Sequence, residues 1–458
     1  MAALSAEGLT QLSEDGRVVP RLAEKWQWEN DGTRLRVTLR EGVTFHDGTP
    51  LTSELAATIL REAINKPSNH SLYPSFLDVA QVRVEGDSQL VFDVRQKSAF
   101  LPENLGLPLT IGAQNSGTGP YRVVKSGPSE IVLERFDDYH LGSPQIRGVV
   151  IRSFQTLRTA WTSLLRADID MVSNVPPEAV EFISNDDIQV VSFARHYQYV
   201  VAFNSRTPQF SSQAVRHALN VAIDRPSLIK NVLQGRGTPA TGPLWPQHWA
   251  IDPAVASYRF DPGLAISLLK SVDLSSYPRS NVPNARFRFT CMIPANFILL
   301  ERVALEVQKQ LYAVGVDMQF DVVSPQEFNA RVNEGRFEAL LIDMVGGPTL
   351  ERGFQFWRSA RHFKGLNVFG YENAEADRTF EVLRVSANEA AVRSATSRLQ
   401  QILLEDPPAL FLAWNERTRA VSKNFSIVQE AGRDPIDPLY TIWRWTAADR
   451  LQASVRTP

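Results

Sequence analysis

The first third of the chain alternates apolar and polar residues in the pattern of short strands. Leu35, Val37 and Leu39 are separated by polar residues, which is the two-residue period of a half-buried strand. Two more pairs of alternating segments flank turn sequences and predict hairpins over 82–94 and 121–135. Between the first strand and these hairpins, apolar residues at helical spacing predict a helix over 52–64. This region is therefore predicted to be mixed α/β.

The rest of the chain changes to alternating helices and strands. Apolar residues at three- and four-residue spacing predict helices near 211–223, 226–233, 301–313 and 374–404, the last being one long helix or two shorter ones. Segments 287–293 and 316–323 are strand-like, as is the aromatic tail from Phe411. Alternation from about residue 155 onward favours α/β lobes. Since no Pro/Gly/Ser-rich seam divides the chain, connections between lobes are expected to be short and structured.

Composition excludes several classes of protein. The chain has 458 residues, with 48 basic and 50 acidic side chains and a net charge of −2, so it lacks the cationic field of a general nucleic-acid binder. Its length alone suggests about three domain-sized units. Cys291 is the single cysteine, which excludes an intramolecular disulfide and a four-cysteine zinc site. No apolar run is long enough to span a bilayer, and residues 1–7 lack the features of a signal peptide.

Motifs for enzymatic chemistry are mostly absent. No Gly precedes a Lys, so there is no P-loop, and neither a zinc-protease nor a nucleophile-elbow motif occurs. The sequence 235–240 matches the loose dinucleotide fingerprint, but it follows a helix and reads as a helix stop and loop. No two of the seven histidines lie three or four residues apart, so no helix presents a chelating pair.

The other candidates for catalytic residues are better explained by structural roles. His46 and Asp47 belong to a turn signal, Asp47-Gly48. Asp168 and Asp170 are better explained as a solvated strand edge than as a catalytic pair. Cys291 lies in an apolar strand-like stretch and is expected to be a buried thiol.

Aromatic residues concentrate in the second half. Each one alone more often packs in a core, yet pockets for organic ligands are typically lined by aromatic side chains with a few polar anchors. The combination of many aromatics with few catalytic motifs favours binding over chemistry. The aromatic residues of the second half that we consider are Trp245, Trp249, Phe297, Trp357, Trp414, Trp443 and Trp445.

Several sequence blocks occur in a characteristic order along the chain. The first block runs from Gly8-Leu9-Thr10 through the sequence 19–26 to 39–52, which reads LREGVTFHDGTPLT. The second is GTGPY at 117–121. The third contains Phe203-Asn204, VRHAL at 215–219 and AIDR at 222–225, and a later segment ends in VGV at 314–316. Each block is weak alone, but the ordered set covers nearly the whole chain. It resembles the extracellular solute-binding protein family 5, the peptide, dipeptide and nickel receptors of ABC importers.

The resemblance implies a two-lobed periplasmic-binding-protein-like α/β fold (type II, cluster C). Lobe I would comprise 1–201, with a small extra subdomain at about 20–107. Lobe II would comprise 202–425, and 426–458 would return to lobe I. The family's ligand binds in an interlobe cleft that closes by a hinge motion. His46 and Asp47 then belong to scaffold.

The resemblance also directs the choice of ligand-binding residues, with aromatics to stack and the backbone amides at Gly346-Gly347 to bind a carboxylate. In peptide-binding members an acid in the loop after the VGV region pairs with the peptide amino terminus. Here Gly347 stands at that position and Met344 at that of a Trp, so amine anchoring would need Asp343 or Glu351 instead. The predicted site residues are Tyr197, Tyr199, Asn204, Phe297, Gly346, Gly347, Phe356, Trp357 and Trp414.

The family's opening strand and a preceding signal segment are not recognised before Gly8, so we expect a truncated or internally started gene model. The localisation implied by the resemblance is periplasmic or membrane-anchored extracellular. The expected partners are a small-molecule or peptide ligand and the membrane permease subunits, with no nucleic acid, and the protein is expected to be a monomer.

The leading functional hypothesis is a receptor that delivers a solute to an ABC permease by cleft closure, with no enzymatic activity, no cofactor and no metal. The alternative is a cytoplasmic ligand-sensing domain of a transcription regulator, which would require a helix-turn-helix head that this sequence lacks. A hydrolase or metal-dependent enzyme is a third class, which the scattered histidines do not favour.

Overall fold

The computed structural model describes residues 2–113, 115–176, 179–180, 183, 185–359, 366–386, 388–428 and 437–448. The chain divides into two compact units. Unit 1 comprises 1–13, 17–194 and 417–458, and unit 2 comprises 14–16 and 195–416. The boundaries that the resemblance implied, after 201 and after 425, lie seven and nine residues beyond these divisions.

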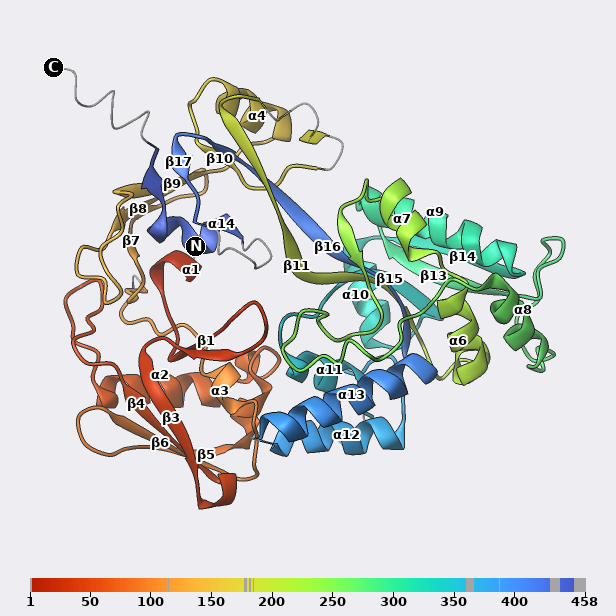
Figure 1. Cartoon of the computed structure of the whole chain (residues 1–458), viewed down its shortest axis with the longest axis horizontal. Helices are drawn as coiled ribbons and strands as arrows, with labels where there is room; N and C mark the ends of the chain where they lie inside the picture. Colours follow the sequence, from red (N-terminus) through yellow and green to blue (C-terminus); the bar gives the residue numbers. More distant parts are fainter. Residues whose placement is uncertain are drawn as a thin grey trace. The chain divides into compact units, whose positions relative to one another are not determined.

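The first part of unit 1 is a small α/β layer (Figure 1). Its four-stranded antiparallel sheet has the order β3-β4-β6-β5, and helix α2 packs against β5. Helix α2 lies where the apolar spacing predicted one, and Thr52 caps it by accepting a hydrogen bond from the Leu55 amide. A short hairpin, β1–β2, precedes this sheet. The bounds are β1 Thr10–Leu12, β2 Val18–Pro20, β3 Ala23–Glu29, β4 Arg34–Leu39, α2 Ser53–Asn65, β5 Val79–Val84 and β6 Gln89–Val94.

The remainder of unit 1 is built around a three-stranded antiparallel sheet, β7-β8-β9. Leu4 of the short helix α1 packs in one apolar cluster with Tyr121, Leu133, Val149 and Trp445. Strand β10 belongs to another sheet and pairs with the end of β16. The bounds are α1 Ala2–Ser5, α3 Leu101–Asn104, β7 Tyr121–Ser126, β8 Glu130–Arg135, β9 Gly148–Arg152, α4 Leu157–Leu165, β10 Met171–Val172, β17 Phe425–Ser426, α14 Pro438–Thr441 and β18 Thr446–Ala447.

Unit 2 is organised by a mixed sheet in which β16, β11, β15, β13 and β14 lie in that order. Strands β13–β14 and β13–β15 are parallel, whereas β11–β15 and β12–β16 are antiparallel. Strands β11 and β16 each continue from one unit into the other. The bounds are β11 Ile188–Phe203, β12 Gly237–Pro239, β13 Phe287–Pro294, β14 Val316–Val323, β15 Ala339–Val345 and β16 Ala409–Ser422.

Helices cover both faces of this sheet because its strands are apolar on both sides. One face, carrying Val201, Phe203 and Leu341, packs with residues of α6, α7, α8 and α9 in a single core cluster. On the other face, Trp357 of α11 contacts Phe411, and α12 and α13 lie side by side (Figure 1). The bounds are α5 Pro208–Ser211, α6 Gln213–Val221, α7 Arg225–Asn231, α8 Pro262–Lys270, α9 Ile298–Ala313, α10 Pro325–Asn333, α11 Leu350–Trp357, α12 Ala374–Val385 and α13 Glu389–Glu405.

The structure confirms most of the elements predicted from the pattern. Both hairpins, the helix α2 and the strand β14 occur where they were expected, and the region 374–404 forms two helices, α12 and α13. Ser212 is the residue that caps α6. Cys291 is buried in β13, and burial raises the pKa of its thiol, so it is an inert core residue. His46 and Asp47 contact Gly119 and Thr49 in a turn, as the structural reading predicted.

Candidate ligand-binding site

Strands β11 and β15 carry polar side chains at the end of the unit 2 sheet. In their antiparallel register Tyr197 lies opposite Val345, and Tyr199 lies opposite Asp343. Successive residues of a strand point to opposite faces. Arg195, Tyr197 and Tyr199 therefore share the face of Val201 and Phe203, while His196 points to the other face.

The first face holds what we call the ion-pair cluster: Arg195, Tyr197, Tyr199, Asp343 and Asn415. The Arg195 Nη1 donates to Asp343 Oδ2 at 2.8 Å, and its guanidinium carbon lies 3.9 Å from the Tyr197 ring centroid. Asn415 Nδ2 donates to Asp343 Oδ1 at 2.6 Å. The side chain of Arg195 thus lies over the Tyr197 ring and reaches the carboxylate of Asp343, the residue opposite Tyr199.

Tyr199 connects this cluster to the core. Its side chain is buried, and burial raises the pKa of its hydroxyl from 10.0 to about 12, with the negative charge of Asp343 acting in the same direction. The phenol therefore stays neutral at physiological pH. It can donate a hydrogen bond without adding a charge.

The other face holds what we call the Trp cluster: His196, Trp245, Trp414, Gly346 and Glu14. The His196 and Trp245 rings meet edge to face at 5.1 Å, and Trp245 and Trp414 do so at 4.9 Å. Trp245 Nε1 donates to the Glu14 carbonyl at 3.0 Å, and His196 Nε2 lies 3.2 Å from Glu14 Oε2. Both indoles are almost fully buried, so they are packed side chains in this structure.

The two glycines after β15 have distinct structural requirements. A Cβ on Gly346 would lie 2.4 Å from the Trp414 ring, and Gly347 has φ +90°, which favours glycine. The Gly346 amide donates to the His196 carbonyl at 2.9 Å. Of the two backbone amides predicted to bind a carboxylate, that of Gly346 is therefore already used, and the prediction now depends on Gly347.

Five of the nine predicted site residues lie in or beside one of these two clusters. Tyr197 and Tyr199 join the ion-pair cluster, whereas Gly346, Gly347 and Trp414 lie at or beside the Trp cluster. The other four lie elsewhere in unit 2: Asn204, Phe297, Phe356 and Trp357. Their roles in binding stay predictions.

Asn204 ends β11, and its amide donates to the Phe337 carbonyl at 2.8 Å and to that of Gly335. Asn204 also lines a cavity of about 490 Å³. Trp357 is buried, stacked on Phe369 and set edge-on to Phe411, so packing accounts for it. Phe356 is half-buried in α11, and Phe297 is about half exposed just before α9.

The pattern of the sequence did not indicate Arg195, His196 or Asn415 as partners of the predicted residues. Alternation along 195–199 was the available signal, because it places Arg195 on the face of both tyrosines. Asn415 could not be connected to Asp343 from sequence, since 72 residues separate them.

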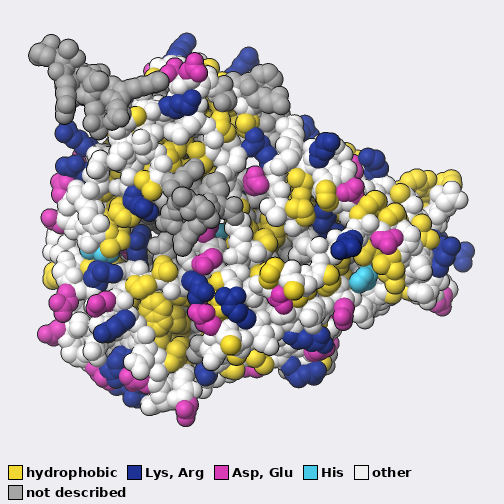
Figure 2. Space-filling view, in the orientation of Figure 1, with side chains coloured by type: hydrophobic (Ala, Val, Ile, Leu, Met, Phe, Trp, Pro, Cys, Tyr) yellow, Lys and Arg dark blue, Asp and Glu magenta, His cyan; other side chains and the backbone are white. Residues whose placement is uncertain are grey.

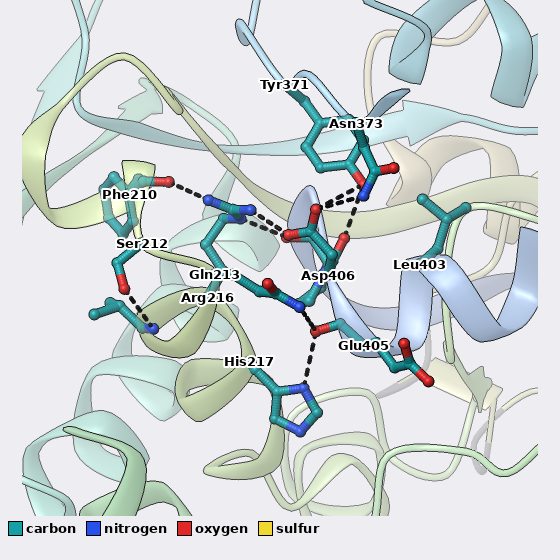
Figure 3. Close-up of polar contacts among 12 residues, drawn as sticks. Phe210, Ser212, Gln213, Arg216, His217, Tyr371, Asn373, Leu403, Glu405 and Asp406 are labelled. Atoms are coloured by element: carbon teal, nitrogen blue, oxygen red, sulfur yellow. Dashed lines mark hydrogen bonds and ion pairs between the residues drawn. The ribbon is translucent and has the colours of Figure 1, made fainter. Parts of the chain in front are cut away.

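A second polar cluster of unit 2 is drawn in Figure 3: Arg216, Asp406, Tyr371 and Asn373. The buried Arg216 guanidinium pairs with Asp406 and also donates to the carbonyls of Phe210 and Pro407. The other Asp406 oxygen accepts from Asn373 Nδ2 at 2.8 Å, and Tyr371 donates to the Asp406 carbonyl at 3.0 Å. All of these groups are engaged with one another, so we interpret the cluster as structural.

Unit 1 contains a cavity of about 710 Å³ of its own. It is bordered by β9 and β10, by the start of α4 and by Trp445, and its lining is mostly apolar. Asp168 and Asp170 lie at this cavity, and burial raises the pKa of Asp170. Both residues lie in the connection between α4 and β10, and not on the strand edge that was expected from the sequence.

The described residues give no indication of a metal centre or a membrane span. No group of three or more His, Cys, Asp or Glu side chains among them could hold a metal ion. None of the helices they form is both long and apolar enough to cross a bilayer. Figure 2 shows basic and acidic side chains interspersed over the visible face, without a large field of one sign.

Comparison with known proteins defines the class. The family model of the bacterial extracellular solute-binding proteins, family 5 Middle, matches residues 17–362. The oligopeptide-binding protein AppA of Bacillus subtilis is 25% identical over 96% of this chain and 86% of that protein. The glutathione-binding protein GsiB of Escherichia coli K12 is 25% identical over 92% of this chain and 85% of that protein.

A solved structure supports the same fold. NikZ of Campylobacter jejuni, determined in complex with Ni(L-His), superposes with a TM-score of 0.80 at 20% identity, over 97% of this chain and 94% of that one. The architecture is therefore that of the two-lobed solute-binding proteins, as predicted.

Fold and relatives together define a solute-binding protein. The chain belongs to the bacterial extracellular solute-binding proteins of family 5. Its relatives are substrate-binding components of ABC importers, so this chain is a component of that type. The comparisons give no support to the transcription-regulator alternative.

Proposed function

We propose that this protein captures a peptide or similar small organic solute outside the cytoplasm and delivers it to the membrane permease of an ABC importer. The family match over 17–362 carries the proposal. The relatives named above are described as binding oligopeptides and glutathione, which supports a peptide-like or other small organic ligand.

The mechanism we propose is binding without covalent chemistry. The family consists of solute-binding proteins, and the polar clusters of unit 2 pair charges with one another instead of exposing a nucleophile beside a base. Closure of the two units about the solute stays a prediction, as does the monomeric state.

The ligand-contacting residues we propose are those at the end of the unit 2 sheet. The ion-pair cluster offers a guanidinium on an aromatic ring, and the adjacent strand connection offers Gly347. Aromatic and charged side chains in this combination are typical of sites that bind small organic ligands. Asn204 and Trp357 are weaker candidates, because packing and carbonyl contacts already account for them.

A thermal-shift screen of the purified protein tests the proposal. Dipeptides, oligopeptides, glutathione and opine-type compounds form the first panel, and sugars form the comparison panel. A ligand that binds the folded state stabilises it by RT ln(1 + L/Kd), where L is the ligand concentration, so the melting temperature rises with the logarithm of L once this exceeds Kd. Stabilisation by the first panel is expected, and the absence of any response to either panel would argue against a receptor.

Native mass spectrometry of protein purified without denaturation gives an independent measurement. A bound small molecule that dissociates at higher collision energy would identify the solute directly. We expect compounds that are incubated with the protein to be recovered unchanged. Conversion of any of them to a product would instead indicate an enzyme.

A further inference from the structure

Arg195 has unused hydrogen-bonding capacity at the end of the unit 2 sheet. A guanidinium carries five N–H donors in a fixed plane. Within the described part of the chain, Arg195 makes one hydrogen bond, to Asp343, and one ring contact, to Tyr197. Its side chain is 29% exposed, so the remaining donors are accessible.

Asp343, in contrast, already has its charge compensated. Its Oδ2 accepts a hydrogen bond from the positively charged guanidinium of Arg195, and its Oδ1 accepts one from Asn415. Anchoring a ligand ammonium requires an anion whose charge is not already paired. Asp343 therefore fails as a replacement for the amine-binding acid that Gly347 displaces.

Glu351, the other possible replacement, is buried in the first turn of α11. The residue is 6% exposed, and it already interacts with another group of the described structure. A ligand amine would have to displace that interaction and enter a buried position. Of Arg195, Asp343 and Glu351, only Arg195 combines partial exposure with hydrogen-bond donors that the described chain does not use.

We propose that Arg195 is the anchor for a carboxylate of the ligand, with Asp343 and Tyr197 as positioning residues. The ligand class is then a solute with an accessible carboxylate, for which a free α-amine is not a requirement in this unit. This inference rests on the proposed function, because it names a specificity determinant of the same solute site.

The geometry suits the role. The guanidinium lies over the ring of Tyr197 and donates to Asp343, so it is already positioned and little side-chain entropy is lost when a second carboxylate binds it. Planar guanidinium groups bind carboxylates through two parallel hydrogen bonds. An arginine shared between two carboxylates keeps both of its edges satisfied.

The test uses a panel of Ala-Phe, its N-acetyl form, its C-terminal amide, N-acetyl-Phe and lactate-derived and succinate-derived opine compounds, each acid paired with its amide. Binding to the full chain is measured by thermal shift and then by calorimetry for compounds that respond. We expect the acids to bind in both amine-free and amine-bearing forms and their amides to bind at least about 10-fold more weakly.

Four variants separate the roles. Arg195→Gln is expected to weaken binding of the acids about 30-fold or more, and Arg195→Lys is expected to recover part of that loss. Asp343→Asn is expected to weaken acid binding by about three- to tenfold, equally for amine-free and amine-bearing acids, because it removes the carboxylate that positions the Arg195 guanidinium. Arg288→Gln is the matched control, since Arg288 is exposed on β13 and contacts a neutral side chain, Gln319.

Each outcome decides between the proposals. Acids and amides that bind equally, or an Arg195→Gln variant that binds the acids like the original chain, would overturn the inference while keeping the proposed function. Loss of binding in Asp343→Asn for amine-bearing compounds alone would identify Asp343 as an amine anchor and likewise overturn it. No binding by any compound would count against the proposed function itself.

Discussion

Unit 2 contains two clusters built from the same residue types in different surroundings. Arg216, Asp406, Asn373 and Tyr371 form one, and Arg195, Asp343, Asn415 and Tyr199 form part of the other. In each, an arginine and an asparagine donate to one aspartate near a tyrosine. The exposed fractions differ: 5% and 13% for the Arg216–Asp406 pair, against 29% and 28% for Arg195–Asp343.

The difference shows how the same chemistry serves structure in one place and is available for binding in another. Arg216 donates to the Phe210 and Pro407 carbonyls as well as to Asp406, so its capacity is used inside the protein (Figure 3). Arg195 has one hydrogen-bonding partner in the described chain and reaches solvent. Burial and saturation, more than residue identity, distinguish the two.

The largest expected effect comes from breaking the buried cluster. Arg216→Ala leaves the Asp406 carboxylate buried without its main partner, and breaking a buried pair in this way costs about 3–5 kcal/mol. We expect the free energy of unfolding of unit 2 to fall by that amount, as measured by urea titration followed by tryptophan fluorescence.

Arg288→Ala is the control for Arg216→Ala, because it removes an arginine from an exposed position of the same unit. Its expected effect is within about 0.5 kcal/mol. A loss for Arg216→Ala no larger than that of the control would show that the buried cluster is not structural, and the comparison would fail.

The sequence predicted the position of Arg216 better than its function. The block VRHAL at 215–219 was recognised as family scaffold, and the apolar spacing around it predicted α6. Its partner Asp406 is 190 positions further along the chain. Local periodicity determines helices and strands, but it contains no information about which distant carboxylate an arginine meets.

The same limit explains the site. Tyr197 and Tyr199 were predicted as site residues, and the two-residue period of β11 puts both on one face, with Tyr199 opposite Asp343. Asn204 and Trp357 are also polar or aromatic residues in recognised segments, yet they contact Phe337 and Phe369 in the interior. Their surroundings depend on side chains from distant segments, which no single stretch of sequence displays.

The two tyrosines sharpen the comparison through pH. The pKa of Tyr199 is raised from 10.0 to about 12 by burial, and that of Tyr371 is raised well above 10.0, also chiefly by burial. A raised folded-state pKa means that the neutral phenol is the form that stabilises the fold. The stability from Tyr199 is therefore fully present below pH 10 and is lost as the pH rises from 10 to 12.

Two pH units at one site correspond to about 3 kcal/mol. We expect Tyr199→Phe to remove this loss, so the difference in unfolding free energy between variant and original chain should change between pH 10 and 12. Parallel pH profiles for the two proteins would contradict the burial of Tyr199 and bring the two clusters closer in character.

The Trp cluster gives a smaller effect by a different mechanism. A Cβ at residue 346 would meet the Trp414 ring at 2.4 Å, so Gly346→Ala forces the indole or the strand end to move. Overpacking of this kind costs about 1–3 kcal/mol. Gly242→Ala is a fair control, because nothing lies within 4 Å of the Cβ there. Equal melting temperatures for the two variants would show that the contact yields easily.

The smallest effect on stability is expected where the effect on binding is largest. Arg195→Gln breaks a pair that is nearly one-third exposed, and such pairs contribute about 0–1 kcal/mol. Its melting temperature should therefore lie close to that of the original chain, while Arg216→Ala melts well below it. If Arg195→Gln were instead destabilised as much as Arg216→Ala, the ion-pair cluster would be a second structural pair. Exposure would then have been a poor guide to which arginine is available for a ligand.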